Sequence, residues 1–148
     1  MKTSFRLSIL TSILTLFILS TAYAQASVVG KWKTIDDETN EPKSIVEIFE
    51  KDGKYYGKIV KLFLKPGDDQ NPTCDKCKDD DPRKDKPTLG MVIMQDMVKK
   101  GEKYGDGTIL DPKKGKVYKC KFWTEEGNLK LRGYIGVFFR TQTWLPAE

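Results

Sequence analysis

Hydrophobic and polar positions alternate in short runs along most of this chain, which is the pattern of β-strands with one face in water. The clearest example lies between Gly105 and Gly136. Two turns interrupt it, because residues 111–115 contain Asp-Pro and Gly and residues 125–128 end in Gly-Asn, which are residue types that tight turns require. Residues 116–123 are rich in Val, Tyr, Phe and Trp, which favour strands. The stretch predicts an antiparallel meander.

The same criteria predict five further strands, over residues 28–34, 44–50, 55–64, 91–98 and 138–145. The period of residues 91–98 does not separate helix from strand, because their apolar run is nearly continuous, but the flanking glycines and the β-rich context favour a strand. Eight antiparallel strands with mostly short connections predict an all-β fold. We expect an eight-stranded, up-and-down, lipocalin-like barrel, since closure removes exposed sheet edges. An open sandwich is the alternative.

Residues 65–88 break the pattern, since they hold four prolines, many aspartates and almost no apolar side chain. A connection of this length is usually functional or mobile. Asp79-Asp80-Asp81 lacks the alternating oxygen ligands and closing glutamate of a calcium loop, so we expect a solvated charged loop and no metal site.

Cys74 and Cys77 lie in this loop and are separated by two residues. A redox pair is one reading, but a reactive thiol usually has its pKa lowered by a helix N-terminus or a cation, whereas the neighbouring aspartates raise it. Zinc would need two more ligands. We expect a structural disulfide, and we expect Cys120, between Tyr118 and Phe122, to be a buried free thiol.

The first 24 residues have the pattern of a secretory signal peptide. Lys2 and Arg6 precede an apolar run over residues 7–19, and Ala22-Tyr23-Ala24 fits a cleavage site. The alternative, a retained membrane helix, is disfavoured because the apolar run is short for a bilayer. We expect a single domain over residues 25–148 that is soluble after cleavage and located in the periplasm or secreted.

Charge and composition exclude several function classes. The net charge of +5 falls to +3 once Lys2 and Arg6 are removed, and the remaining lysines alternate with apolar residues, so we expect no nucleic-acid binding. The chain has no histidine, which excludes histidine acid–base catalysis, Ser-His-Asp and Cys-His arrangements and most catalytic zinc sites. We therefore expect a protein that is not an enzyme and carries no cofactor.

Several motifs resemble a known family. Gly30-x-Trp32, with an arginine near the last strand's end, resembles the lipocalin and calycin pattern. The motifs Asp52-Gly53-x-Tyr55-x-Gly57, Cys74-x-x-Cys77, Ile109-Leu110-Asp111-Pro112, Leu131-Arg132-Gly133-Tyr134 and Arg140-Thr141-Gln142-Thr143-Trp144 resemble secreted bacterial domains of unknown function with a lipocalin-like barrel. The resemblance implies this fold and a place in the cell envelope, but no activity. It also implies that Trp32 closes one barrel end while Arg140, or its competitor Arg132, packs across the indole.

Alternation assigns the candidate ligand-binding residues to the interior of the barrel. We expect six of them to point inward, namely Tyr118, Phe122, Leu129, Leu131, Gly133 and Ile135. They line a ligand cavity or fill a solid core, because an eight-stranded barrel permits both. The first hypothesis is binding of a small apolar molecule, such as a fatty acid, near Gly133. The alternatives are a structural or protein-binding envelope module with a solid core, and a thiol–disulfide protein using Cys74 and Cys77.

Overall fold

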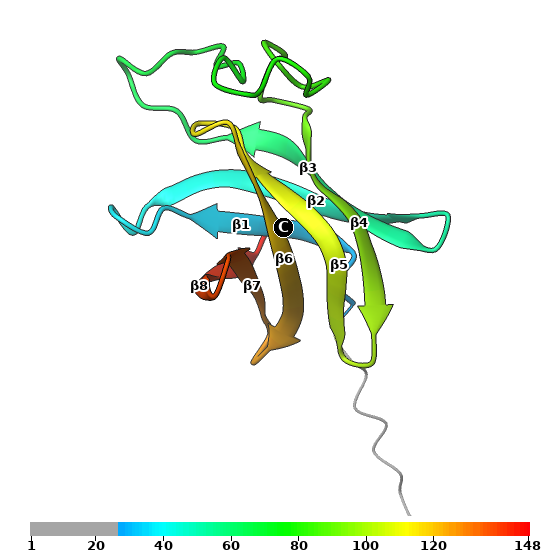
Figure 1. Ribbon diagram of the computed structural model, residues 1–148. Coiled ribbons are helices and arrows are strands. Elements are labelled where there is room, and N and C mark those ends of the chain that lie inside the picture. Colours follow the sequence, from blue (N-terminus) through cyan, green and yellow to red (C-terminus); the bar gives the residue numbers. More distant parts are fainter. Residues whose placement is uncertain (1–26) are drawn as a thin grey trace, which may run out of the picture.

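The computed structural model describes residues 27–148, which form a barrel of β-strands (Figure 1). The predicted signal peptide lies outside the described residues. The eight strands are β1 (Gly30–Ile35), β2 (Pro42–Lys51), β3 (Lys54–Leu62), β4 (Val92–Lys100), β5 (Lys103–Asp111), β6 (Lys116–Glu125), β7 (Asn128–Ile135) and β8 (Phe138–Pro146).

Each strand pairs antiparallel with the next, and β1 pairs with β8 to close the barrel. The predicted all-β, eight-stranded up-and-down barrel is therefore confirmed, and the open sandwich is excluded. Closure between β1 and β8 is short, with Trp32 opposite Pro146 and Lys33 opposite Leu145. Residues 91–98, whose period was ambiguous, lie mostly within strand β4.

Two tight turns follow from residues that accept a left-handed backbone. Asp52 and Gly53, between β2 and β3, have φ values of 51° and 74°, and Glu126 and Gly127, between β6 and β7, have 51° and 79°. Two consecutive positive φ values match the right-handed twist of the flanking strands. The two hairpin turns therefore lie where the sequence pattern predicts a break between strands.

The core lies inside the barrel and consists of the inward-facing residues of all eight strands. The largest side chains that are fully buried include Val46, Ile48, Met94, Met97, Phe122, Leu129 and Trp144. Leu110 is also fully buried, although it pairs with the exposed Val117 on the outer face. The long connection between β3 and β4 packs next to Leu110, on the β5–β6 turn, where its Cys74 sulfur lies 3.4 Å from the Pro112 carbonyl oxygen.

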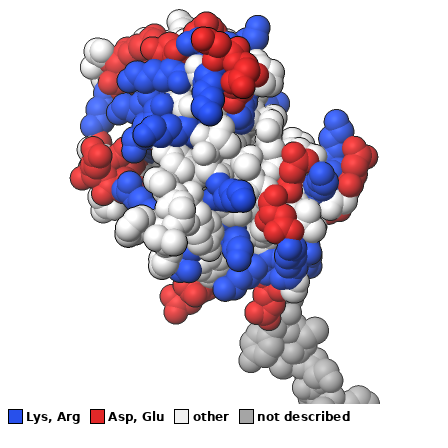
Figure 2. All heavy atoms as spheres, in the orientation of Figure 1, with Lys and Arg blue, Asp and Glu red and all other residues white. Residues whose placement is uncertain are grey.

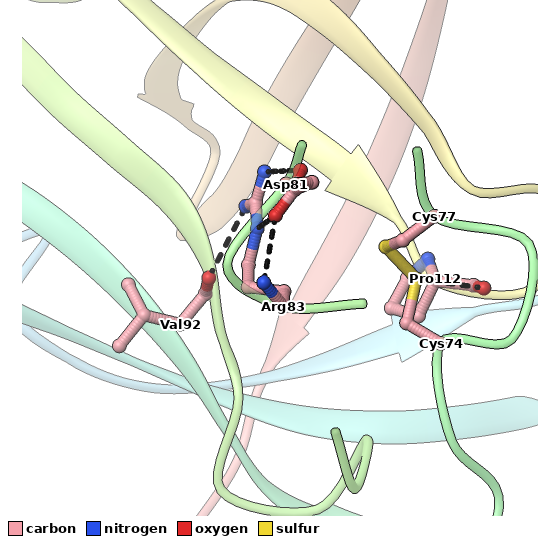
Figure 3. A network of polar contacts seen from close by, with 6 residues as sticks. All are labelled: Cys74, Cys77, Asp81, Arg83, Val92 and Pro112. Carbon is pink, nitrogen blue, oxygen red and sulfur yellow. Dashed lines mark hydrogen bonds and ion pairs between the residues drawn. A yellow bond between two sulfur atoms is a disulfide. The ribbon is translucent and has the colours of Figure 1, made fainter. Parts of the chain in front are cut away.

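The β3–β4 connection, predicted to be functional or mobile, is tied to itself and to the barrel. Asp81 accepts hydrogen bonds from the Arg83 side chain at 2.7 and 2.9 Å, and an Arg83 guanidinium nitrogen donates to the Val92 carbonyl of β4 at 3.4 Å (Figure 3). At the other side, the Cys74 sulfur lies 3.4 Å from the Pro112 carbonyl. The connection therefore has fixed contacts with both β4 and the β5–β6 turn.

Candidate functional site

The inner wall formed by β6, β7 and β8 holds all six candidate ligand-binding residues, and strand register arranges this wall in rows. Phe122 lies opposite Leu131, and Leu131 lies opposite Gln142. One row further along, Cys120 lies opposite Gly133, and Gly133 lies opposite Arg140. We call the barrel end with the β6–β7 turn the closed end, and the end with the β7–β8 turn the open end.

The rows near the closed end are packed solid. Phe122, Leu129, Leu131 and Trp144 are buried. Tyr104 stacks on Phe122 with ring centroids 4.6 Å apart, and its edge meets Tyr55 at 4.7 Å. Burial raises the pKa of the Tyr104 hydroxyl. The predicted residues Phe122, Leu129 and Leu131 are therefore part of a filled core.

The rows near the open end are not covered. Tyr118 and Gly133 are half-buried and the Arg140 side chain is 59% exposed, although Cys120, opposite Gly133, is buried. A Cβ atom added at Gly133 would meet only the Tyr118 Cβ within 4 Å, at 3.9 Å. Solvent therefore reaches the inward face of the wall from Gly133 outward, and the packed rows form its floor.

Ile135 corrects one expectation about this wall. Alternation predicts an inward, buried side chain, but Ile135 is 65% exposed. It pairs with Phe138 at the last rung before the β7–β8 turn, where no neighbouring side chains cover it. Alternation gives the face of a strand residue, but not whether the barrel extends far enough to bury it.

A polar network joins the floor to the rim of the open end. The Asp37 carboxylate accepts from the Arg140 guanidinium at 2.7 Å and from the Gln142 amide nitrogen at 2.6 Å. The Gln142 amide oxygen accepts from the Trp144 indole at 3.4 Å. Asp37 lies in the β1–β2 turn, so the network crosses the short seam between β1 and β8. Sequence reasoning missed Asp37 and Gln142 as site residues, since only the closed barrel brings the β1–β2 turn to β8.

Trp32 is buried as expected, but its predicted cation–π contact is wrong. Within residues 27–148 no arginine stacks on Trp32; its indole nitrogen donates to the Val28 carbonyl at 2.8 Å. Arg140 pairs with Asp37 instead, and Arg132 lies over Phe139 at 4.2 Å and Trp123 at 5.4 Å. Arg132 cannot reach Trp32 because Trp32 points inward while Arg132 lies on the outer face. Arg140 lies on the inner wall, but its guanidinium is held by Asp37 at the open end, whereas Trp32 pairs with Pro146 near the closed end.

The cysteines behave as predicted. Cys74 and Cys77 form a disulfide, and Cys120 is a buried free thiol. Burial raises the pKa of the Cys120 thiol to about 12. Both disulfide sulfurs belong to residues that are almost fully buried, beside Pro112 (Figure 3). Such burial leaves little access for a substrate thiolate, which favours the structural role.

Two surface pockets lie away from the predicted interior site. One, of about 320 Å³, is lined by residues of the β3–β4 connection and β4, including Arg83, Leu89 and Met91. The other, of about 270 Å³, lies at the closed end and includes Val28, Tyr55 and Tyr104. Neither is lined by any of the six predicted residues. The interior site beside Gly133 therefore stays a prediction, and its inner surface is half-buried at that residue.

Comparison with protein families shows to which family this chain belongs. Residues 30–145 match the family described as "Uncharacterized protein conserved in bacteria (DUF2147)". The chain belongs to the DUF2147 family. This confirms the resemblance to bacterial domains of unknown function. No curated protein matches the chain.

The DUF2147 chain also resembles a solved structure, described as "Protein HP1028 from the human pathogen Helicobacter pylori belongs to the lipocalin family". The TM-score is 0.69 at 20% sequence identity, and the match covers 82% of this chain and 84% of that one. At this identity the likeness concerns the fold alone. The DUF2147 domain is thus a lipocalin-like barrel, an architecture that often holds small ligands.

Proposed function

We propose that the protein binds a small amphipathic molecule at the open end of its barrel, on the surface formed by Tyr118, Gly133 and Arg140. The change in burial along the inner wall carries the proposal. Leu131 is buried, whereas Gly133, two residues further along β7, is half-buried and has free space at the position of a Cβ. A glycine at such a point lets another molecule approach the backbone closely.

The chemistry of the surface suggests the ligand class. The buried Cys120 and Leu131 supply an apolar floor, and the Tyr118 ring adds an apolar side wall with one hydroxyl. The Arg140 guanidinium, already paired with Asp37, offers charge-assisted hydrogen bonds to an anionic head group. We therefore favour a ligand with an apolar body and a carboxylate, of which a fatty acid is one example.

The cellular location is part of the proposal. A Cys74–Cys77 disulfide is typical of proteins outside the reducing cytoplasm. Together with the signal-like first 24 residues, it supports an address in the periplasm or outside the cell. A ligand in that compartment would reach the barrel without crossing the inner membrane.

Titration with the fluorescent probe anilinonaphthalene sulfonate tests the site, followed by competition with decanoate and with decanol. We expect saturable probe binding that decanoate displaces. Gly133→Leu should weaken it about tenfold or more by filling the free space, whereas Gly133→Ala, whose Cβ meets only an ordinary contact, should change it little. Circular dichroism melting confirms that each variant is folded.

The Arg140–Asp37 pair gives opposite expectations for two variants. Arg140→Gln should weaken the binding of decanoate more than that of decanol, because it removes the cation that pairs with the decanoate carboxylate. Asp37→Asn should strengthen the binding of decanoate, because the Arg140 guanidinium then no longer pairs with the Asp37 carboxylate. If folded Gly133→Leu binds the probe as the wild type does, the open end is not the site.

A further inference from the structure

The turn between β7 and β8 exposes large apolar side chains that the barrel core does not use. Ile135, Val137, Phe138 and Phe139, which we call the apolar tip, are 65%, 89%, 76% and 58% exposed. Gly136 between them has a φ of 58°, so the chain reverses there. Contiguous exposed apolar side chains on a soluble domain mark a contact surface.

The apolar tip presents apolar groups in more than one direction. Ile135 and Phe138 form the last pair of β7 and β8, whereas Tyr134 and Phe139 form the preceding pair. Side chains of successive residues point to opposite faces of a strand. A flat protein surface would therefore cover only one side of this hairpin, but a fluid apolar phase would surround all of it.

Cations accompany the apolar tip along the outer face of β6 and β7. Lys119, Lys121 and Arg132 have no ion pair within residues 27–148. The one acidic side chain of β6, β7 and β8 is Glu125, at the closed end, and it lies 3.9 Å from Lys130. In Figure 2 the surface over β7 and β8 is mostly white, and both Lys or Arg and Asp or Glu side chains border it.

Aromatic rings lie among these cations. The Lys121 ammonium lies 5.9 Å from the centre of the Tyr134 ring, and Arg132 lies between the rings of Trp123 and Phe139. Aromatic side chains beside basic ones are the residues that anchor proteins at the boundary between head groups and acyl chains. An acidic protein partner would match the charge, but it would leave the apolar tip partly in water.

We propose that this protein docks on anionic lipid bilayers, with the apolar tip inserted among the acyl chains and Lys119, Lys121 and Arg132 against the head groups. The proposal is independent of ligand binding inside the barrel. It concerns peripheral attachment: no helix within residues 27–148 is long and apolar enough to cross a membrane. Anionic lipid adds a favourable contribution for each cation near the surface.

Flotation with vesicles tests the proposal, using the exported protein from which the predicted signal peptide, with its own apolar run, has been removed. We expect binding to vesicles of phosphatidylcholine with phosphatidylglycerol, weakened by salt, and little binding to phosphatidylcholine alone. Val137→Ser with Phe138→Ser should lower binding about tenfold or more, and so should Lys119→Ala with Lys121→Ala. Leu89→Ser, which removes an apolar side chain of similar exposure (56%) from the β3–β4 connection, should not.

A local probe reports insertion of the tip itself. Val137→Cys can be labelled with the environment-sensitive dye nitrobenzoxadiazole, because Cys120 is buried and the other cysteines are bonded. Anionic vesicles should raise and blue-shift the dye fluorescence, whereas the dye at Leu89→Cys should stay unchanged. Equal dye responses at both positions would overturn the proposal. So would a dimer of the wild type in the absence of lipid that dissociates when the tip residues are substituted.

Discussion

Gly115, in the β5–β6 turn, is the residue at which an added methyl group would meet another part of the chain most directly. A Cβ built there would lie 1.8 Å from the Lys76 carbonyl oxygen, and the φ of Gly115 is 64°. The disulfide turn of the β3–β4 connection therefore packs directly on this glycine. Only a residue without a side chain permits both the backbone conformation and the contact.

We predict that Gly115→Ala destabilises the protein more than Gly127→Ala does. Gly127 also has a positive φ, of 79°, but nothing lies within 4 Å of its Cβ position. Both variants carry the cost of a left-handed alanine, about 1–2 kcal/mol, and Gly115→Ala adds an overpacking cost of about 1–3 kcal/mol. Urea denaturation measures the difference. Equal losses would mean that the connection does not rest on Gly115.

Cys120 predicts a stability change at alkaline pH. Burial raises the pKa of its thiol from 9.0 to about 12, so the unfolded chain loses this proton at a lower pH than the folded chain does. The contribution of the protonated Cys120 thiol to the free energy of unfolding is therefore complete below pH 9. It decreases as the pH rises towards 12, by about 1.4 kcal/mol per pH unit at most.

The measurement compares urea midpoints of the wild type and Cys120→Ala between pH 8 and about pH 11. Subtracting the two curves removes the titration of tyrosines and lysines. The difference in urea midpoint between the wild type and Cys120→Ala should become smaller as the pH rises. A constant gap would show that the thiolate forms as easily in the folded protein as in the unfolded one.

Single residues were predictable where one strand decides their environment. The burial of Cys120 and Phe122 follows from lysines alternating with them, and the disulfide follows from two nearby cysteines. Ile135 and Arg140 were not predictable in the same way. Their surroundings depend on where the barrel ends and on the distant Asp37, which alternation along one strand does not report.

At the scale of elements, the β3–β4 connection is the segment that sequence patterns describe least well. Its composition indicates a solvated loop, but Arg83 and Asp81 are mostly buried together, with side-chain exposures of 14% and 13%. The hydrogen bonds from Arg83 hold the pKa of the Asp81 carboxyl below its usual value. Strands were predictable because their period repeats, whereas the contacts of an irregular segment leave no periodic signal.

We predict that Asp81→Asn loosens this connection without unfolding the barrel. The substitution removes the charge that pairs with Arg83 and leaves the guanidinium partly buried without its anion. Limited proteolysis should cut within residues 65–88 several-fold faster, while the denaturation midpoint of the barrel falls only slightly. Asp79→Asn is the matched control, because Asp79 is exposed and has no ion pair among the described residues.

The pH dependence of this cleavage provides a second readout. Because the pKa of Asp81 is lowered, the pair stabilises the connection above the carboxyl's unfolded pKa and loses this effect as the pH falls. Cleavage by an acid-stable protease should therefore accelerate in acid for the wild type and much less for Asp81→Asn. Parallel pH profiles would contradict the role of the pair.

At the scale of the whole molecule, the inner wall of β6, β7 and β8 is packed near the closed end and only half-buried near the open end. We predict that Trp32→Ala lowers stability by about 3–5 kcal/mol, because it removes a buried indole and the hydrogen bond to Val28. Gly133→Ala at the open end should change stability by less than about 1 kcal/mol, since its Cβ has room. Denaturant midpoints of the two variants test this asymmetry.

The short seam between β1 and β8 has a consequence for how the chain folds. Every other pairing joins neighbouring strands, but the seam joins Trp32 to Pro146 and Lys33 to Leu145, from opposite ends of the described chain. Such a distant contact forms last, after the local hairpins have already assembled. Until then the sheet has two free edges, and another unfinished chain can pair with either of them. Refolding at high protein concentration should therefore favour strand-exchanged dimers and aggregates over closed monomers.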